Sequence, residues 1–340
     1  MSRLILSKAR PALPWAARRA GDDYGAPASP DWRDVNWRPH VHQVEIDGGN
    51  VNYVDYGDGD GPPVVFVHGL GGCWQNWLEQ IPRVAELRRV IAVDLPGCGF
   101  SDMPKDGISI PGFGKVVAAL CERLGFDQVA LVGHSMGGFV GAEVAIQNPD
   151  VVERLVLLSA AGISITELRR RPVLVGARIV AAIGTRTAAQ AKLVVTHRRL
   201  RPVVYSTFIR HPTRIPTDFL YEVTRGAGRK GFHPSLEALT DYDFRERLSE
   251  IRCPTLIVWG ADDMLVPVKD ADEFERLIDD SRKVVFEDTG HSAMMERPRA
   301  FNDCIVDFLA APRAARAEAA ERNGGQAADV SAERAGSPAS

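Results

Sequence analysis

A serine set between a strand pattern and a helix pattern most constrains how this 340-residue chain folds. Residues 129–149 read VALVGHSMGGFVGAEVAIQNP, a short apolar run typical of a buried strand followed at once by helical spacing. Ser135 lies at the junction, with Gly133 before it and Gly137 and Gly138 after it. A chain that turns directly from strand into helix strains the serine backbone, and only small residues two positions away avoid a clash. The G-x-S-x-G pattern in this context predicts an exposed, nucleophilic hydroxyl at a helix start.

Several other apolar runs have the same character and define the sheet. They are short, rich in β-branched residues and end in Gly, Ser or Pro: PPVVFVHG (62–69), RRVIAVDLPG (88–97), QVALVGHS (128–135) and RLVLLSA (154–160). Segments with helical spacing separate them, at 109–124 and 136–148, and residues 43–57 alternate like a hairpin. Buried strands alternating with helices indicate an α/β fold, a mostly parallel, doubly wound sheet covered on both faces.

The alternation is interrupted once. It stops at Gly162 and resumes with PTLIVWG (254–260), a helix near 268–279, RKVVFED (282–288) and a last helix near 298–309. Residues 163–240 show no convincing strand and read as short helices broken at Pro172, Gly184, Pro202, Pro212 and Gly226. The sequence therefore predicts a core of residues 43–162 and 241–309 with an inserted helical cap at 163–240. An N-terminal extension (1–42) precedes it, and a tail (310–340) that lacks large aliphatic side chains is expected to be disordered.

A serine hydroxyl is a weak nucleophile at neutral pH and needs a base that is oriented by an acid. WGADDMLVP (259–267) follows a strand and offers Asp262 and Asp263, and EDTGHSAMMERP (287–298) follows the last strand and offers His291. Only one of two adjacent aspartates can face the histidine. We choose Asp263 as the acid and His291 as the general base, and Asp262 is the alternative.

The tetrahedral intermediate of acyl transfer also needs backbone N–H donors. FVHGLGG (66–72) supplies a glycine-rich loop after a strand, and the N–H groups of Leu70 and Met136 are the candidates for an oxyanion hole. His68 in the same loop is interpreted as a structural histidine that hydrogen-bonds the loop.

Five motifs together resemble the α/β-hydrolase superfamily, in its cap-bearing branch of esterases and lipases, over residues 43–309. They are HGLGG (68–72), DLPGCGFSD (94–102), GHSMGG (133–138), GADDMLVP (260–267) and GH (290–291). The resemblance implies a nucleophile at Ser135, an acid at Asp263, a base at His291, and an oxyanion hole at Leu70 and Met136. It also implies no cofactor and a structural role for Asp94.

Related enzymes of this architecture provide alternatives. Epoxide hydrolases and haloalkane dehalogenases use an aspartate nucleophile, so Ser135 argues against both. Carbon–carbon bond hydrolases keep the serine triad and usually have a tryptophan just after the histidine, where this chain has Ser292. A non-catalytic binding protein of the same fold is a third reading. The primary prediction is hydrolysis of a small-molecule carboxylic ester through an acyl-enzyme, with an apolar acyl group held under the cap.

Composition narrows the partners and the location. The net charge is −3, which argues against a nucleic-acid partner. No apolar run is long enough to span a bilayer. Five scattered cysteines without a CxxC pair predict free thiols and a cytoplasmic protein. His40 and His42 gather no further ligands, so no metal site is predicted.

Positive charge concentrates in two places. Residues 163–240 carry 14 Lys+Arg against 4 Asp+Glu, and the first 20 residues contain Arg3, Lys8, Arg10, Arg18 and Arg19 without an acidic residue. A basic cap or N-terminus could contact an anionic membrane surface. Solvated helix faces are the simpler explanation of the cap charges.

Overall fold

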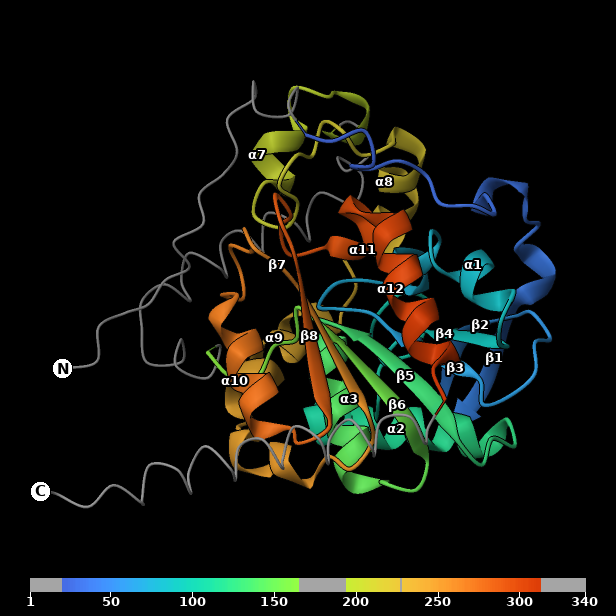
Figure 1. Ribbon diagram of the computed structural model, residues 1–340. Coiled ribbons are helices and arrows are strands. Elements are labelled where there is room, and N and C mark those ends of the chain that lie inside the picture. Colours follow the sequence, from blue (N-terminus) through green and yellow to red (C-terminus); the bar gives the residue numbers. More distant parts are fainter. Residues whose placement is uncertain (1–19, 165–193, 227, 313–340) are drawn as a thin grey trace, which may run out of the picture.

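The computed structural model describes residues 20–164, 194–226 and 228–312. Eight strands form one sheet in the order β1-β2-β4-β3-β5-β6-β7-β8 (Figure 1). β1 (Val41–Ile46) and β2 (Gly49–Tyr56) form the expected hairpin, and β2 pairs antiparallel with β4. The other strands run parallel: β3 (Val64–Val67), β4 (Val90–Val93), β5 (Val129–His134), β6 (Val152–Leu158), β7 (Thr255–Gly260) and β8 (Ser281–Phe286). The predicted α/β-hydrolase fold is confirmed.

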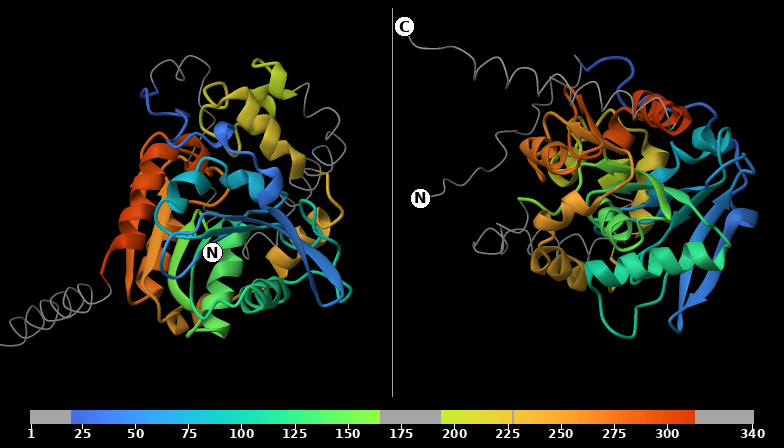
Figure 2. Two further views of the ribbon diagram at one scale, coloured as in Figure 1. Left: turned by 90° about the vertical axis from the view of Figure 1, so that its right-hand side faces the viewer. Right: turned by 60° about the horizontal axis from the view of Figure 1, so that its bottom comes forward.

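Helices cover both faces of the sheet (Figure 2). Successive residues of a strand point to opposite faces, so Val65 and Val67 belong to one core, and Val64 and Phe66 to the other. The first core is closed by α2 (Ile110–Arg123), α3 (Met136–Gln147) and α10 (Lys269–Leu277). The second is closed by α1 (Ile81–Ala85), α11 (Ala293–Glu296) and α12 (Pro298–Ala310). The four longer predicted helices, at 109–124, 136–148, 268–279 and 298–309, appear as α2, α3, α10 and α12.

The region between β6 and β7 is helical where it is described. It contains α7 (Arg201–Tyr205), α8 (Thr217–Val223), the 3-10 helix η5 (Thr224–Gly226) and α9 (Phe232–Asp241), and its described part holds no strand. In Figure 1, α7 and α8 lie at the top of the molecule, whereas α9 lies lower, and its Leu239 joins the core that α2 and α3 close. Pro202 lies in the first turn of α7, where proline fits, so it marks a helix boundary as expected. Pro172 and Gly184 lie outside the described residues, and the cap boundaries stay predictions.

Residues 20–40, which we call the N-terminal strap, cross the top of the molecule (Figure 1). The strap contains two 3-10 helices, η2 (Trp32–Asp34) and η3 (Arg38–His40). Trp32 Nε1 donates to Glu79 Oε1 of the core at 2.9 Å, and the Trp32 ring lies 6.4 Å from that of Phe219 in α8. The strap therefore joins α8 to the core. The basic residues from Arg3 to Arg19 and the tail beyond residue 312 lie outside the described residues.

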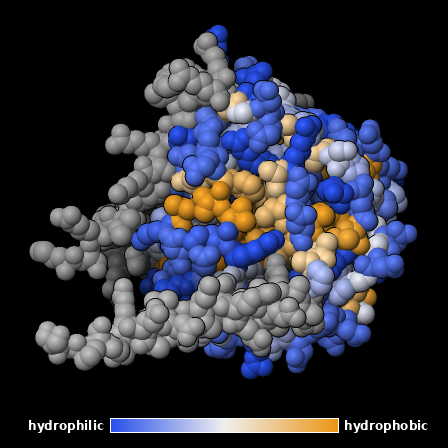
Figure 3. Space-filling view, viewed as in Figure 1, coloured by the Kyte–Doolittle hydropathy of each residue, from blue (hydrophilic) through white to orange (hydrophobic). Residues whose placement is uncertain are grey.

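The edge strand β8 lies on the face shown in Figure 3, where apolar residues form patches among polar ones. Lys283 of β8 donates to Asp272 Oδ1 of α10 at 2.7 Å, and such charged groups protect an edge from pairing with another chain.

Two further 3-10 helices flank strands of the core: η4 (Trp74–Trp77) after β3 and η6 (Arg245–Glu250) before β7. Among the residues described here, no helix has the length and apolar character that crossing a bilayer requires.

Candidate active site

Ser135 lies at the sharp turn between β5 and α3, as the motif predicts. Its backbone has φ +54° and ψ −115°, a strained conformation for a residue with a side chain. A Cβ on Gly133 would lie 2.2 Å from the Gly137 carbonyl oxygen, and a Cβ on Gly137 would lie 2.1 Å from the Val67 carbonyl oxygen. Both contacts are too short to exist, so a side chain at either position would force the neighbouring backbone to move. The half-buried Ser135 side chain then stands at the N-terminus of α3.

His291 and Asp263 form a buried pair. His291 Nδ1 donates to Asp263 Oδ2 at 2.7 Å, and the side chains are 3% and 0% exposed. Asp263 Oδ1 accepts the N–H groups of Leu265 at 2.8 Å and Val266 at 2.9 Å, which keep the carboxylate oriented. A proton on Nδ1 leaves the lone pair of the neutral imidazole on Nε2, where it can accept a proton.

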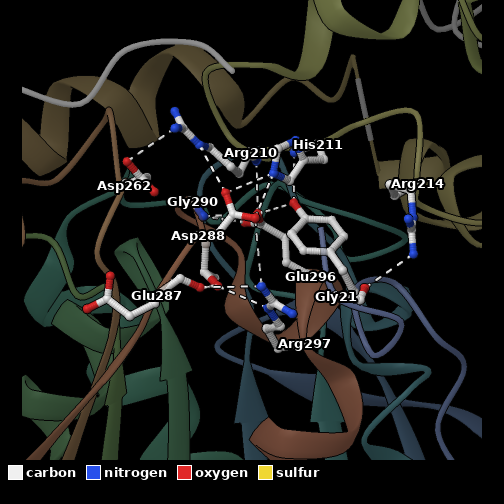
Figure 4. A network of polar contacts seen from close by, with 12 residues as sticks. Gly21, Arg210, His211, Arg214, Asp262, Glu287, Asp288, Gly290, Glu296 and Arg297 are labelled. Atoms are coloured by element: carbon white, nitrogen blue, oxygen red, sulfur yellow. Dashed lines mark hydrogen bonds and ion pairs between the residues drawn. The ribbon is translucent and has the colours of Figure 1, made fainter. Parts of the chain in front are cut away.

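Asp262 points elsewhere. Its carboxylate is 28% exposed and lies 3.5 Å from Arg210 Nη2, as Figure 4 shows. Of the two adjacent aspartates, Asp263 is therefore the one that the structure pairs with His291.

The glycine-rich loop after β3 lies against the serine turn. A Cβ on Gly69 would lie only 3.2 Å from Ser135 Cβ, so the backbone of this loop passes directly beside the serine. In the described part of the chain, the N–H groups of Leu70 and Met136 have no hydrogen-bond acceptor. Both predicted donors thus lie next to Ser135 in sequence or in space and can bind an oxygen atom.

His68 holds this loop from behind. Its Nε2 accepts the Leu95 N–H at 3.0 Å and its Nδ1 donates to the Gly69 carbonyl at 2.8 Å, so both ring nitrogens are used. Burial lowers the pKa of His68 to about 4 and keeps the ring neutral. The expectation of a structural histidine is confirmed.

Asp94 organises the neighbouring turn. Its carboxylate accepts the N–H groups of Trp74 at 2.7 Å and Phe100 at 2.9 Å, and the Asn52 amide at 2.9 Å. Burial raises the pKa of Asp94 to about 6, and the three hydrogen bonds oppose this shift. These contacts agree with the structural role expected for this residue.

Sequence reasoning missed Glu296, which is fully buried in α11. Its carboxylate accepts the N–H groups of Gly290 at 2.9 Å and Ser292 at 3.1 Å, the residues on either side of His291. It also accepts the Arg210 N–H at 2.8 Å and the Tyr24 hydroxyl proton. Figure 4 shows Glu296 and Gly290. Burial raises the pKa of Glu296, and the hydrogen bonds from its four donors oppose the rise. The available signal was an acidic residue in the otherwise apolar run AMME just after the histidine.

His134, the residue before the serine, connects the turn to the histidine loop. Its Nε2 donates to the His291 carbonyl oxygen at 3.0 Å, and the two rings lie 4.8 Å apart. Burial, helped by the nearby His291, lowers the pKa of His134 well below its usual value, so its ring stays neutral. The serine turn and the histidine loop are thereby held next to each other.

The region between β6 and β7 also reaches the histidine loop. The His291 N–H donates to the Phe208 carbonyl at 3.0 Å, and the Phe208 side chain is 40% exposed. Phe219 of α8 is buried, and its ring lies against Trp32 of the strap. Four other apolar residues of the predicted cap, Leu174, Ile179, Val180 and Ile183, lie outside the described residues.

Comparisons with known proteins agree with the fold. Residues 62–298 match the family model of the alpha/beta hydrolase fold. The chain is 30% identical over 296 residues to a 2-hydroxy-6-oxo-2,4-heptadienoate hydrolase of Pseudomonas putida, covering 82% of this chain and 99% of that protein.

Two solved structures are similar along most of the chain. One, of an N-acyl homoserine lactone degrading enzyme, has a TM-score of 0.62 and 26% identity, covering 78% of this chain and 100% of the other. The other, of a serine hydrolase involved in carbazole degradation, has a TM-score of 0.61 and 27% identity, covering 79% and 98%. The family match, the sheet order and the serine turn lead to one conclusion: this chain belongs to the α/β-hydrolase superfamily and is a hydrolase of small molecules.

Proposed function

We propose that this protein is a serine hydrolase that cleaves carboxylic esters through an acyl-enzyme formed on Ser135. The observation that carries the proposal is the buried 2.7 Å hydrogen bond between Asp263 and His291, held beside a strained serine turn. An acid, a base and a nucleophile in this order along the chain form the arrangement that serine hydrolases of this fold use.

The proposed reaction has two halves. Ser135 Oγ attacks the ester carbonyl carbon, His291 Nε2 takes the hydroxyl proton, and the buried Asp263 carboxylate stabilises the imidazolium. The N–H groups of Leu70 and Met136 bind the oxyanion. Collapse of this intermediate breaks the ester C–O bond, and His291 returns its proton to the departing alcohol. A water molecule, deprotonated by His291, then attacks the acyl-enzyme and releases the carboxylic acid and free Ser135.

Two observations support an ester with an apolar acyl group. One of the two similar structures is that of an enzyme that degrades an N-acyl homoserine lactone, and a lactone is a cyclic ester. Phe208, whose carbonyl binds the His291 N–H, and Leu265, beside Asp263, have side chains that are 40% and 36% exposed. Exposed apolar groups on segments that contact the Asp263–His291 pair favour an apolar substrate.

A carbon–carbon bond hydrolase is the second candidate. The observation in its favour is the 30% identity to the heptadienoate hydrolase of Pseudomonas putida, which this chain matches along 99% of its length. Ser292 follows His291 where such enzymes usually carry tryptophan, and this difference favours the ester reaction.

Turnover of two substrate classes tests the proposal. A series of p-nitrophenyl esters of increasing chain length and one 2-hydroxy-6-oxo-dienoate are offered to the full chain and to Ser135→Ala. We expect ester turnover that falls by about 10⁶ in kcat in Ser135→Ala, as in comparable triads. Ser281→Ala, a change in the edge strand β8, is the control and should retain activity.

The same experiment separates the alternatives. A fluorophosphonate should label Ser135, and peptide mass spectrometry locates the adduct. Turnover of the dienoate without turnover of any ester would replace the proposal with the second candidate. A folded protein that turns over neither compound and takes no label would be a binding protein of this fold.

A further inference from the structure

Tyr24 of the strap reaches the histidine loop although it lies upstream of the residues that match the family model, which begin at residue 62. Its side chain is 1% exposed. The ring packs edge-on against the His211 ring at 5.0 Å, and the Arg297 guanidinium lies 4.9 Å from its centre. These contacts hold the Tyr24 hydroxyl in one place.

That hydroxyl makes two hydrogen bonds at once, with Glu296 and His211, which are both labelled in Figure 4. It donates to Glu296 Oε2 and accepts the His211 N–H at 2.8 Å. It therefore joins the strap, the segment after α7 and the carboxylate that binds the His291 loop. No other side-chain hydroxyl among the described residues donates to Glu296.

The Glu296 carboxylate fixes the backbone on both sides of His291. It accepts the Gly290 and Ser292 N–H groups, so a movement of the carboxylate moves the peptide that carries the imidazole. A buried carboxylate that loses a hydrogen-bond donor must find another partner, or its desolvation lowers the stability of the folded protein. Loss of the Tyr24 hydroxyl therefore shifts Glu296 toward its remaining donors and alters the position of the His291 backbone.

We propose that Tyr24 is a positioning residue for His291 that acts through the Glu296 carboxylate. The proposal rests on the proposed role of His291 as the general base. His291 must keep Nδ1 on Asp263 while Nε2 reaches the Ser135 hydroxyl, and small displacements of a reacting group reduce rates strongly.

The test is Tyr24→Phe in the full chain, which removes one oxygen and keeps the ring. Tyr242→Phe is the matched control, because the Tyr242 hydroxyl also donates to a buried glutamate, Glu143, at 2.8 Å, but lies in another part of the fold. Glu296→Gln is the second variant. Each is assayed well below its melting temperature for kcat and KM with a p-nitrophenyl ester and for the rate of fluorophosphonate labelling.

We expect Tyr24→Phe to lower kcat and the labelling rate about tenfold, and Glu296→Gln about a hundredfold, with KM nearly unchanged. Tyr242→Phe should match the parent. The low-field proton NMR signal of His291 Nδ1–H, identified by its absence in His291→Ala, should shift in Tyr24→Phe and stay in place in Tyr242→Phe. A purely structural tyrosine would lower the melting temperature and leave this signal and kcat unchanged.

Parent values of kcat and an unshifted signal in Tyr24→Phe would overturn the inference, whatever its melting temperature. If Tyr24→Phe does not fold, Glu296→Gln decides by the same two readouts. Failure of the proposed function would be seen separately, as a parent protein that hydrolyses no ester and takes no label. The NMR signal of His291 would still show in that case whether the position of His291 depends on Tyr24.

Discussion

Asp262 and Asp263 show how adjacent residues acquire opposite environments. Asp263 is 1% exposed and uses both carboxylate oxygens, one on His291 and one on the turn that follows. Asp262 faces Arg210 near the surface. The sequence locates the pair because a strand ends just before it. Which of the two aspartates meets His291 depends on the direction of the turn. That direction is set by contacts with residues far away in the chain.

Asparagine substitutions in this pair should have unequal effects. Asp263→Asn removes the charge that stabilises the imidazolium and disturbs the tautomer of His291, so we expect a loss of about 10⁴ in kcat. Asp262→Asn leaves the His291 hydrogen bond intact and should cost less than about tenfold, since it alters only a partly exposed ion pair. Steady-state kinetics on one ester give the comparison. Equal losses, or a larger loss in Asp262→Asn, would contradict the assignment of Asp263.

At the scale of elements, the turn from β5 into α3 depends on backbone packing. Gly137 lies in the first turn of α3, where a Cβ would meet the Val67 carbonyl oxygen at 2.1 Å. Gly141 lies one turn further, and its Cβ would meet only the flexible end of Leu155 at 3.3 Å. The two glycines have the same chemistry and different neighbours.

Alanine substitutions should separate them. Gly137→Ala forces β3 and α3 apart and should lower the free energy of unfolding by about 3 kcal/mol. Gly141→Ala gains helix propensity and meets a movable side chain, so we expect a change of about 1 kcal/mol or less. Urea denaturation followed by circular dichroism measures both. A Gly137→Ala protein as stable as Gly141→Ala would show that the turn tolerates a side chain there.

Elements with a local pattern could be predicted from the sequence, and contacts between distant elements could not. Ser109 caps α2 by accepting the Gly112 N–H at 3.1 Å, and Pro298 begins α12, so both helix starts are visible in the sequence. Nothing near Tyr24 indicates that it contacts Glu296, 272 positions later. Glu296 becomes important only because folding buries it beside the His291 loop.

For the whole molecule, the neutral state of His68 makes stability depend on pH. Its pKa is about 4 in the folded protein against 6.5 for a free histidine, so between these values the unfolded chain binds a proton that the folded chain does not. The contribution of His68 is complete above pH 6.5 and is lost as the pH falls through 4. It amounts to about 3 kcal/mol.

The measurement compares the parent with His68→Gln at pH 7 and pH 4 by chemical denaturation. Asp94, with its pKa raised to about 6, gives the opposite trend, since its contribution is lost as the pH rises through 6. The difference between parent and variant isolates His68. We expect the parent to lose more stability on acidification than His68→Gln, while His42→Gln, at an exposed position of β1, follows the parent. Parallel curves for the parent and His68→Gln would contradict the prediction.

The antiparallel hairpin and the strap have a practical consequence for recombinant work. A fragment cut to the family match would start at residue 62 and lack β1 and β2, of which β2 pairs with β4. The unpaired edge of β4 would be open to a second molecule, and exposed strand edges promote aggregation. The same cut would leave Glu79 and Glu296 without Trp32 and Tyr24, so two buried carboxylates would each lose a donor. A soluble fragment for crystallisation should therefore include residues 20–61.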